Sequence, residues 1–142
     1  MILSQTAVYA LRAMLCLAEK AGEGPLRVDD IAAELDVPRN YLSKILHVLG
    51  RAGLLTSTRG PGGGFSLAQP AGGLTLFEVV RHFDDIPEAS ACLLGREVCS
   101  DTDPCPAHLH WKGVSAQVRD FFQETTLADL SRDAPIPHLN TG

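Results

Sequence analysis

The chain has 142 residues, of which 45% are hydrophobic, and its formal net charge is −5. This length suits one compact domain, or a small domain with an appendage. Its longest apolar runs fall short of the roughly 18 residues of a membrane span, and its first residues lack the basic-then-apolar pattern of a secretory signal. We therefore expect a cytoplasmic protein with no membrane partner.

The negative charge is concentrated in the second half of the chain. Residues 1–69 contain seven Lys and Arg against six Asp and Glu, a net charge of +1. Residues 70–142 contain five against eleven, a net charge of −6. The overall acidity therefore does not exclude nucleic-acid binding by the first half, which is free to approach phosphate.

Three helices are predicted in the first half. Ser4 can cap the first, which runs to Lys20 with apolar residues at helical spacing. The second covers Val28–Leu35, and Pro38 opens a third that ends near Ala52. The buried stripe of this third helix is predicted to be Leu42, Ile45, Leu46 and Leu49. Two helices joined by so short a connection are typical of a helix-turn-helix, although an ordinary helical pair is the alternative. The exposed faces of the third helix offer candidate DNA contacts: Arg39, Asn40, Tyr41, Ser43 and Lys44.

A β-hairpin is predicted after the third helix. Two β-prone segments, 54–58 and 65–67, flank the turn-rich sequence R-G-P-G-G-G. Three helices followed by a hairpin is the order of a winged helix. Glycines let backbone N–H groups approach phosphate, and an arginine can enter a narrow minor groove. The candidate contacts at the tip are Arg59, Gly60, Gly62 and Gly63. A plain hairpin with a solvated arginine is the alternative.

The second half is predicted to add two helices. One covers Leu74–Phe83, with Thr75 as its cap, and a long one covers 109–130. The long helix has an apolar stripe formed by Trp111, Val114, Val118, Phe121, Phe122 and Thr125. Twenty helical residues span about 30 Å, more than a small domain needs, so we expect this helix to pair with its copy in a homodimer. Folding back on its own subunit is the alternative.

Three of the four cysteines lie close together in the segment 92–108, C-L-L-G-R-E-V-C-S-D-T-D-P-C-P-A-H. Glycine and proline interrupt regular structure here, so a loop gathers Cys92, Cys99, Cys105 and His108. Thiolates and imidazole are ligands of zinc and of iron–sulfur clusters. The gaps of six and five residues are longer than in most structural zinc sites, which favours a cluster over zinc. A redox disulfide is disfavoured because three thiols cannot all pair with one another and a cytoplasm is reducing. Cys16, inside the first helix, is expected to be a buried structural thiol.

These features predict a mainly α fold with a small β-hairpin. The expected parts are a winged helix-turn-helix domain over 1–70, a connecting helix and linker over 71–91, a cluster-binding loop over 92–108, a dimerisation helix over 109–130 and a flexible tail over 131–142. An enzyme is not expected, because the sequence suggests neither a catalytic set nor a nucleotide loop.

Over about residues 1–130 the chain resembles the winged-helix transcription regulators typified by the iron–sulfur cluster assembly regulator IscR and the nitric oxide-responsive repressor NsrR. The residues that carry the resemblance are L-S-Q-T-A-V-Y-A-L-R-A-M, D-D-I-A-A-E-L-D-V-P-R-N-Y-L-S-K-I-L, A-G-L-L-T-S-T-R-G-P-G-G-G-F-S-L-A and the cysteine loop ending C-P-A-H-L-H-W. It implies a homodimer that binds a two-fold symmetric double-stranded DNA operator and carries one cluster per subunit.

The resemblance also assigns Cys92, Cys99 and Cys105 as cluster ligands. His108 matches the fourth ligand of the assembly regulator, which favours 2Fe–2S over 4Fe–4S. Other members use an N-terminal carboxylate from the partner subunit, but residues 1–18 contain no Asp or Glu. The first cysteine gap is six residues where five is usual in the family, and His110 is a competing ligand. The implied function is a regulator controlled by redox, iron or nitric oxide status; zinc binding or thiol oxidation at the same cysteines is the alternative.

Overall fold

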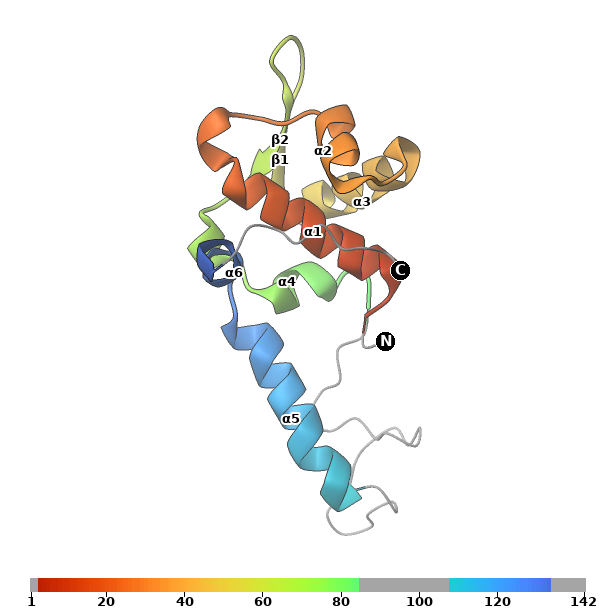
Figure 1. The fold of residues 1–142 in the computed structure, drawn as a ribbon, viewed down its shortest axis with the longest axis vertical. Coiled ribbons are helices and arrows are strands. Elements are labelled where there is room, and N and C mark those ends of the chain that lie inside the picture. Colours follow the sequence, from red (N-terminus) through yellow and green to blue (C-terminus); the bar gives the residue numbers. More distant parts are fainter. Residues whose placement is uncertain (1–2, 85–107, 134–142) are drawn as a thin grey trace.

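The computed structural model describes residues 3–84 and 108–133. The predictions for Cys92, Cys99 and Cys105 therefore lie outside the described residues, as does most of the predicted flexible tail over 131–142. Residues 131–133 of that predicted tail are helical instead. The elements, with η for 3-10 helices, are α1 Gln5–Glu19, η1 Ala21–Glu23, α2 Val28–Leu35, α3 Arg39–Arg51, β1 Leu55–Thr58, β2 Gly64–Leu67, η2 Ala71–Gly73, α4 Leu76–Val80, α5 His108–Glu124 and α6 Leu127–Asp133. Figure 1 shows the β1–β2 wing projecting from one end of the molecule, near α2 and α3, and α5 extending from the other.

Helix α1 is the central helix of the core. Ser4 caps it as predicted, because its Oγ accepts a hydrogen bond from the Ala7 amide at 3.1 Å. Ala7, Ala10 and Ala13 are fully buried, and their small side chains leave room for neighbouring elements to pack closely. Helices α3, α4 and α6 and strand β2 all contact α1. The helix agrees with the predicted Ser4–Lys20 to within one residue at each end.

Helices α2 and α3 form the predicted helix-turn-helix. Asp36 makes the turn between them with a φ of 54°, a left-handed conformation that aspartate tolerates better than most residues. Helix α3 buries the predicted apolar stripe, Leu42, Ile45, Leu46 and Leu49. This packing fixes α3 against the core and leaves its opposite face to solvent.

The wing is an antiparallel pair in which Leu55 lies opposite Leu67 and Thr58 opposite Gly64. A contact that the sequence did not predict anchors it. The Leu26 amide donates to the Phe65 carbonyl at 2.9 Å, and the Leu26 carbonyl accepts from the Phe65 amide at 2.7 Å. The hairpin is thus tied to the chain just before α2, and the predicted winged-helix fold is confirmed.

The second half differs from prediction in two places. Helix α4 covers only Leu76–Val80, with Thr75 as the expected cap, rather than Leu74–Phe83. The single helix expected over 109–130 is two helices, α5 and α6, with a break at Thr125 and Thr126.

Hydrogen bonds explain the break. The Leu76 amide donates to the Thr125 carbonyl at 2.9 Å, and the Leu127 amide donates to the Leu74 carbonyl at 2.9 Å. Thr126 and Asp129 then cap α6 reciprocally, each accepting the other's backbone N–H on its side chain. Within the described ranges, no helix combines the length and the apolar character needed to span a bilayer.

Candidate nucleic-acid interface and the cysteine segment

The exposed face of α3 forms a candidate DNA-contacting surface. Of the predicted contacts, Arg39, Asn40 and Lys44 are exposed and Ser43 is partly exposed. Two further exposed residues, His47 and Arg51, continue the line of Asn40 and Lys44 at spacings of three and four, which lie on one face of a helix. The same spacing, present in the sequence, could have added both to the candidate set.

Tyr41 differs from the other predicted α3 contacts because its side chain is bonded to α1. It is half-buried, and its hydroxyl is hydrogen-bonded to the Thr6 side chain of α1. Its ring packs edge-on against Tyr9 with 5.6 Å between ring centroids. Tyr41 therefore joins α3 to α1, and a direct contact with DNA stays a prediction.

Arg39 is paired in the free protein. Its Nε bonds the Asp29 carboxylate, and the two side chains are 59% and 68% exposed. An ion pair this exposed contributes little stability. A phosphate can therefore replace Asp29 as the partner of Arg39 at small cost.

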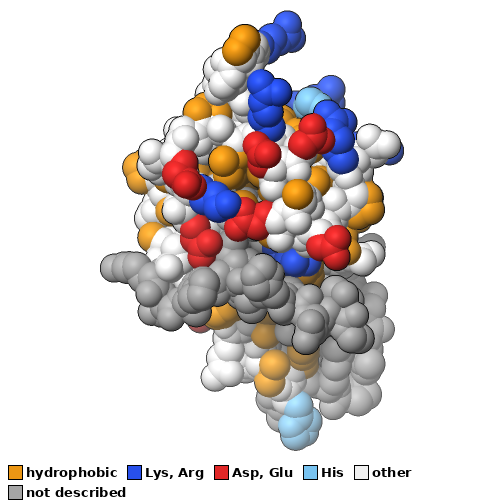
Figure 2. All heavy atoms as spheres, turned by 45° about the horizontal axis from the view of Figure 1, so that its top comes forward, with side chains coloured by type: hydrophobic (Ala, Val, Ile, Leu, Met, Phe, Trp, Pro, Cys, Tyr) orange, Lys and Arg blue, Asp and Glu red, His pale blue; other side chains and the backbone are white. Residues whose placement is uncertain are grey.

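The tip of the wing has a backbone path that requires glycine. Gly60 and Gly62 have φ angles of 91° and 75°, and the Gly63 amide donates to the Gly60 carbonyl at 2.9 Å. A Cβ on Gly63 would lie 2.3 Å from the Thr58 carbonyl oxygen. This tight turn leaves Arg59 exposed beside it. Figure 2 shows Lys and Arg side chains on the wing and on the surface around its base.

The predicted cluster ligands are described only in part. Cys92, Cys99 and Cys105 lie outside the described residues. His108 is the first residue of α5, and His110 in its first turn is exposed. Among residues 3–84 and 108–133, the structure brings together no three His, Cys, Asp or Glu side chains able to hold a metal.

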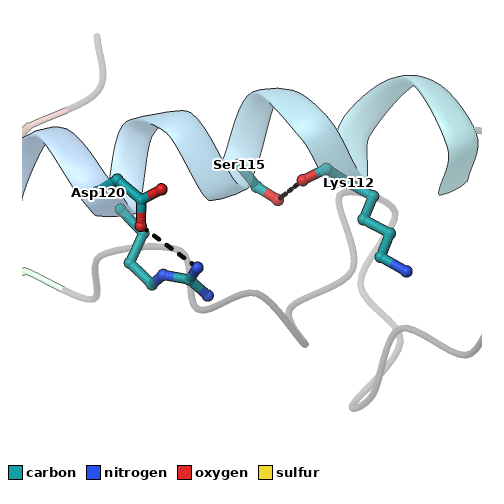
Figure 3. Close-up of polar contacts among 4 residues, drawn as sticks. Lys112, Ser115 and Asp120 are labelled. Atoms are coloured by element: carbon teal, nitrogen blue, oxygen red, sulfur yellow. Dashed lines mark hydrogen bonds and ion pairs between the residues drawn. The ribbon is translucent and has the colours of Figure 1, made fainter.

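Helix α5 has polar contacts within the helix and an exposed apolar face. Ser115 is fully buried, and its Oγ donates to the Lys112 carbonyl at 3.1 Å (Figure 3). Arg119 pairs with Asp120 at 3.4 Å along the same helix. The side chains of Val114 and Phe121 are 50% and 51% exposed. A groove of about 420 Å³ runs along this open face, lined by Leu3, Val114, Gln117, Val118, Phe121 and Phe122.

Cys16, the cysteine outside the segment 92–108, has an unreactive environment. It is fully buried in α1. Burial, and secondly the Glu34 carboxylate, raise the pKa of its thiol from 9.0 to about 11. Because the folded state holds this proton more tightly than the unfolded state, the thiol's contribution to stability is present below pH 9 and is lost as the pH rises through about 11.

We expect Cys16 to resist alkylation in the folded protein. At pH 8 a thiol with a pKa of about 11 is ionised in only about one molecule in a thousand, and this one is also shielded from reagent. Iodoacetamide treatment of metal-free protein followed by peptide mass spectrometry checks this; denatured protein, in which all four cysteines react, is the control. Modification of native Cys16 as fast as in the denatured chain would contradict the result.

Comparison with known proteins identifies the family of this chain. Residues 3–133 match the model of the Rrf2 family, described as an iron-dependent transcriptional regulator. The HTH-type transcriptional regulator IscR of Erwinia tasmaniensis is 34% identical over 128 residues, which are 90% of this chain and 77% of that protein.

Two solved structures are similar over nearly the whole chain. CymR, the global cysteine regulator of B. subtilis, has a TM-score of 0.81 at 29% identity, covering 95% of this chain and 99% of CymR. The T. potens IscR structure has a TM-score of 0.76 at 27% identity, covering 100% of this chain and 94% of that one. These relatives are transcription regulators and not enzymes. The chain therefore belongs to the Rrf2 family, as a winged-helix, DNA-binding transcription regulator of the IscR type.

Proposed function

We propose that operator binding by this protein is controlled by an iron–sulfur cluster held by Cys92, Cys99, Cys105 and His108. The observation that carries the proposal is this donor set in a chain that matches an iron-dependent regulator family. Three thiolates and an imidazole fit an iron–sulfur cluster, and we favour 2Fe–2S over 4Fe–4S. A bound cluster would supply a centre that responds to redox, iron or nitric oxide status in a reducing cytoplasm.

In this proposal the exposed face of α3 enters the major groove of double-stranded DNA. Asn40 can donate to and accept from a base edge, whereas Arg39 and Lys44 supply positive charge to phosphate. Ser43 is partly exposed beside them. The wing would place Arg59 in the neighbouring minor groove, with the exposed backbone of Gly60 and Gly62 against phosphate. Gly63, which was also a predicted contact, is buried, and its amide is bonded to the Gly60 carbonyl, so it shapes the turn instead. Two such units, related by a dimer axis, would read a two-fold symmetric operator.

The open apolar face of α5 supports a homodimer. The groove along it is bounded by Val114 and Phe121, and exposed apolar surface of this kind marks protein–protein contact. We expect Phe121→Asp to weaken dimerisation by about 2 kcal/mol, roughly 30-fold, because a charge would be buried among apolar groups. Sedimentation equilibrium of the metal-free protein measures the effect.

Gln123→Asp is the matched control for this dimer test, because it adds the same charge to α5 at an exposed polar position. The control should dimerise as the wild type does. An unchanged monomer–dimer equilibrium in Phe121→Asp would remove α5 from the proposed interface.

The cluster proposal is tested by anaerobic purification with iron, sulfide and zinc analysis, followed by operator-binding titrations with and without the bound metal. Equal iron and sulfide, two of each per chain, together with a different operator affinity after metal removal, is the expected result. Four of each would indicate 4Fe–4S, and zinc without sulfide would indicate a zinc regulator. An operator affinity that is the same with and without the bound metal would overturn cluster control.

Thiol oxidation is the second candidate. The structural similarity to CymR favours it, because one solved structure of Staphylococcus aureus CymR is of an oxidised form and has a TM-score of 0.73 with this chain. A protein that stays colourless and metal-free after reconstitution, and whose operator binding is switched by peroxide and restored by a thiol reductant, would establish this alternative.

A further inference from the structure

Asp84, eight residues before the cysteine segment, is tied to the start of α1. The Ser4 backbone amide donates to Asp84 Oδ2 at 2.6 Å, across 80 positions in the sequence. This short distance is that of a charge-assisted hydrogen bond, and the carboxylate lies at the N-terminal, positive end of the α1 dipole. Ser4 is also the N-cap of α1, so Asp84 is held directly against the beginning of that helix.

The first turn of α1 is in turn tied to the first turn of α3. Thr6 Oγ1 and the Tyr41 hydroxyl are hydrogen-bonded, and Tyr9 packs edge-on against the Tyr41 ring. Tyr41 adjoins Asn40 on the helix whose outer face carries the candidate DNA contacts. A shift of the N-terminal turn of α1 therefore displaces the beginning of α3.

We propose that Asp84 is a positioning residue that couples the cysteine segment to the recognition helix through α1. Cys92 follows Asp84 by eight residues, and Asp84 is the last described residue before the cysteine segment. The Ser4–Asp84 hydrogen bond is then made in one metal state and broken in the other, and the Thr6–Tyr41 contact carries the difference to α3. Coupling requires such an element with two arrangements, whose balance both sites bias. This inference rests on the proposed function.

The test is the ratio of operator affinities in the metal-loaded and metal-free states. Couplings of this kind change affinity by about 5- to 150-fold. Asp84→Ala is expected to bind metal as the wild type does and to bring the ratio to within about twofold of one. Tyr41→Phe, which removes only the hydroxyl that bonds Thr6, is expected to reduce the ratio as well.

Two control variants should keep the wild-type ratio. Glu34→Ala removes a carboxylate that holds the opposite end of α1 through Lys20. Tyr9→Phe removes a hydroxyl from the same aromatic pair, but that hydroxyl accepts from Gln5 and does not bond α3. A merely structural role for Asp84 would lower the thermal midpoint and both affinities together without changing the ratio.

The outcomes separate the two proposals. Asp84→Ala with full metal content and the wild-type ratio overturns the coupling inference and leaves cluster control intact. A wild-type protein with equal affinity in its two states overturns cluster control, and this inference falls with it. If Asp84→Ala does not fold, Tyr41→Phe decides: a wild-type ratio overturns the inference, and a reduced ratio supports it.

Discussion

Cys99→Ala is expected to abolish iron binding and with it the response of operator affinity to the metal state. Cys99 is the middle of three thiols in the cysteine segment, and thiolates are the anionic ligands that hold iron in a cluster. Without it the remaining two thiolates and one imidazole leave an iron position open. The variant should purify with little iron or sulfide and bind the operator with the affinity of the metal-free wild type, within about twofold.

Cys16→Ala is the matched control for Cys99→Ala. Cys16 is fully buried in α1 with a raised thiol pKa, so its loss removes packing and no ligand. We expect normal iron content, an unchanged affinity ratio, and a loss of stability of about 1 kcal/mol from the small cavity. A Cys99→Ala protein with full iron and sulfide, and with a wild-type response to metal removal, would exclude Cys99 as a ligand and would leave the cluster proposal without its central thiol.

Local patterns in the sequence were sufficient for the winged helix. The apolar spacing of Leu42, Ile45 and Leu49 identified the buried side of α3, because a regular helix puts residues three and four apart on one face. The glycines at 60 and 62 identified the wing tip, because the turn there needs positive φ angles. Both signals depend only on neighbours in the chain, and both were confirmed by the structure.

The predictions that were wrong depended on contacts between distant segments. Periodicity continued across Thr125 and Thr126, but backbone hydrogen bonds to Leu74 and Leu76 end α5 there. These partners lie some fifty residues away in the sequence, and no local pattern contains them. The Thr126-x-x-Asp129 pattern that caps α6 was readable as a helix start, and it would have divided the predicted helix correctly.

The candidate site residues also differ in whether local sequence patterns could identify them. Asn40, Lys44, His47 and Arg51 lie in one line along the helix, so the candidate DNA-contacting face of α3 follows from spacing. The role of Tyr41 did not follow, because its partner Thr6 lies 35 residues away on another helix. The proposed ligands in the cysteine segment could be named from the sequence alone, because thiol and imidazole side chains are recognised by their chemistry and not by their position in the fold.

Gly64→Ala is expected to disrupt the wing and to weaken operator binding. Gly64 opens β2 with a φ of 149°, and a Cβ there would lie 2.2 Å from the Leu26 carbonyl oxygen. The obstructing atoms are backbone, so no side-chain rotation relieves the clash. The strand must move away from Leu26, which weakens the paired Leu26–Phe65 hydrogen bonds at 2.9 and 2.7 Å. Strain of this kind costs about 1–3 kcal/mol.

The same change should act on DNA binding because Gly64 lies next to the tip that carries Arg59. If the wing no longer presents Arg59 to the DNA, the loss of a specific contact should cost about 1–3 kcal/mol, roughly 5- to 150-fold in operator affinity. Thermal unfolding and an operator titration of the same preparation measure both effects. Gly22→Ala is the control, since a Cβ there meets nothing within 4 Å, and it should leave both quantities unchanged. If Gly64→Ala lowered the thermal midpoint but kept full operator affinity, the wing would serve the fold and not DNA recognition.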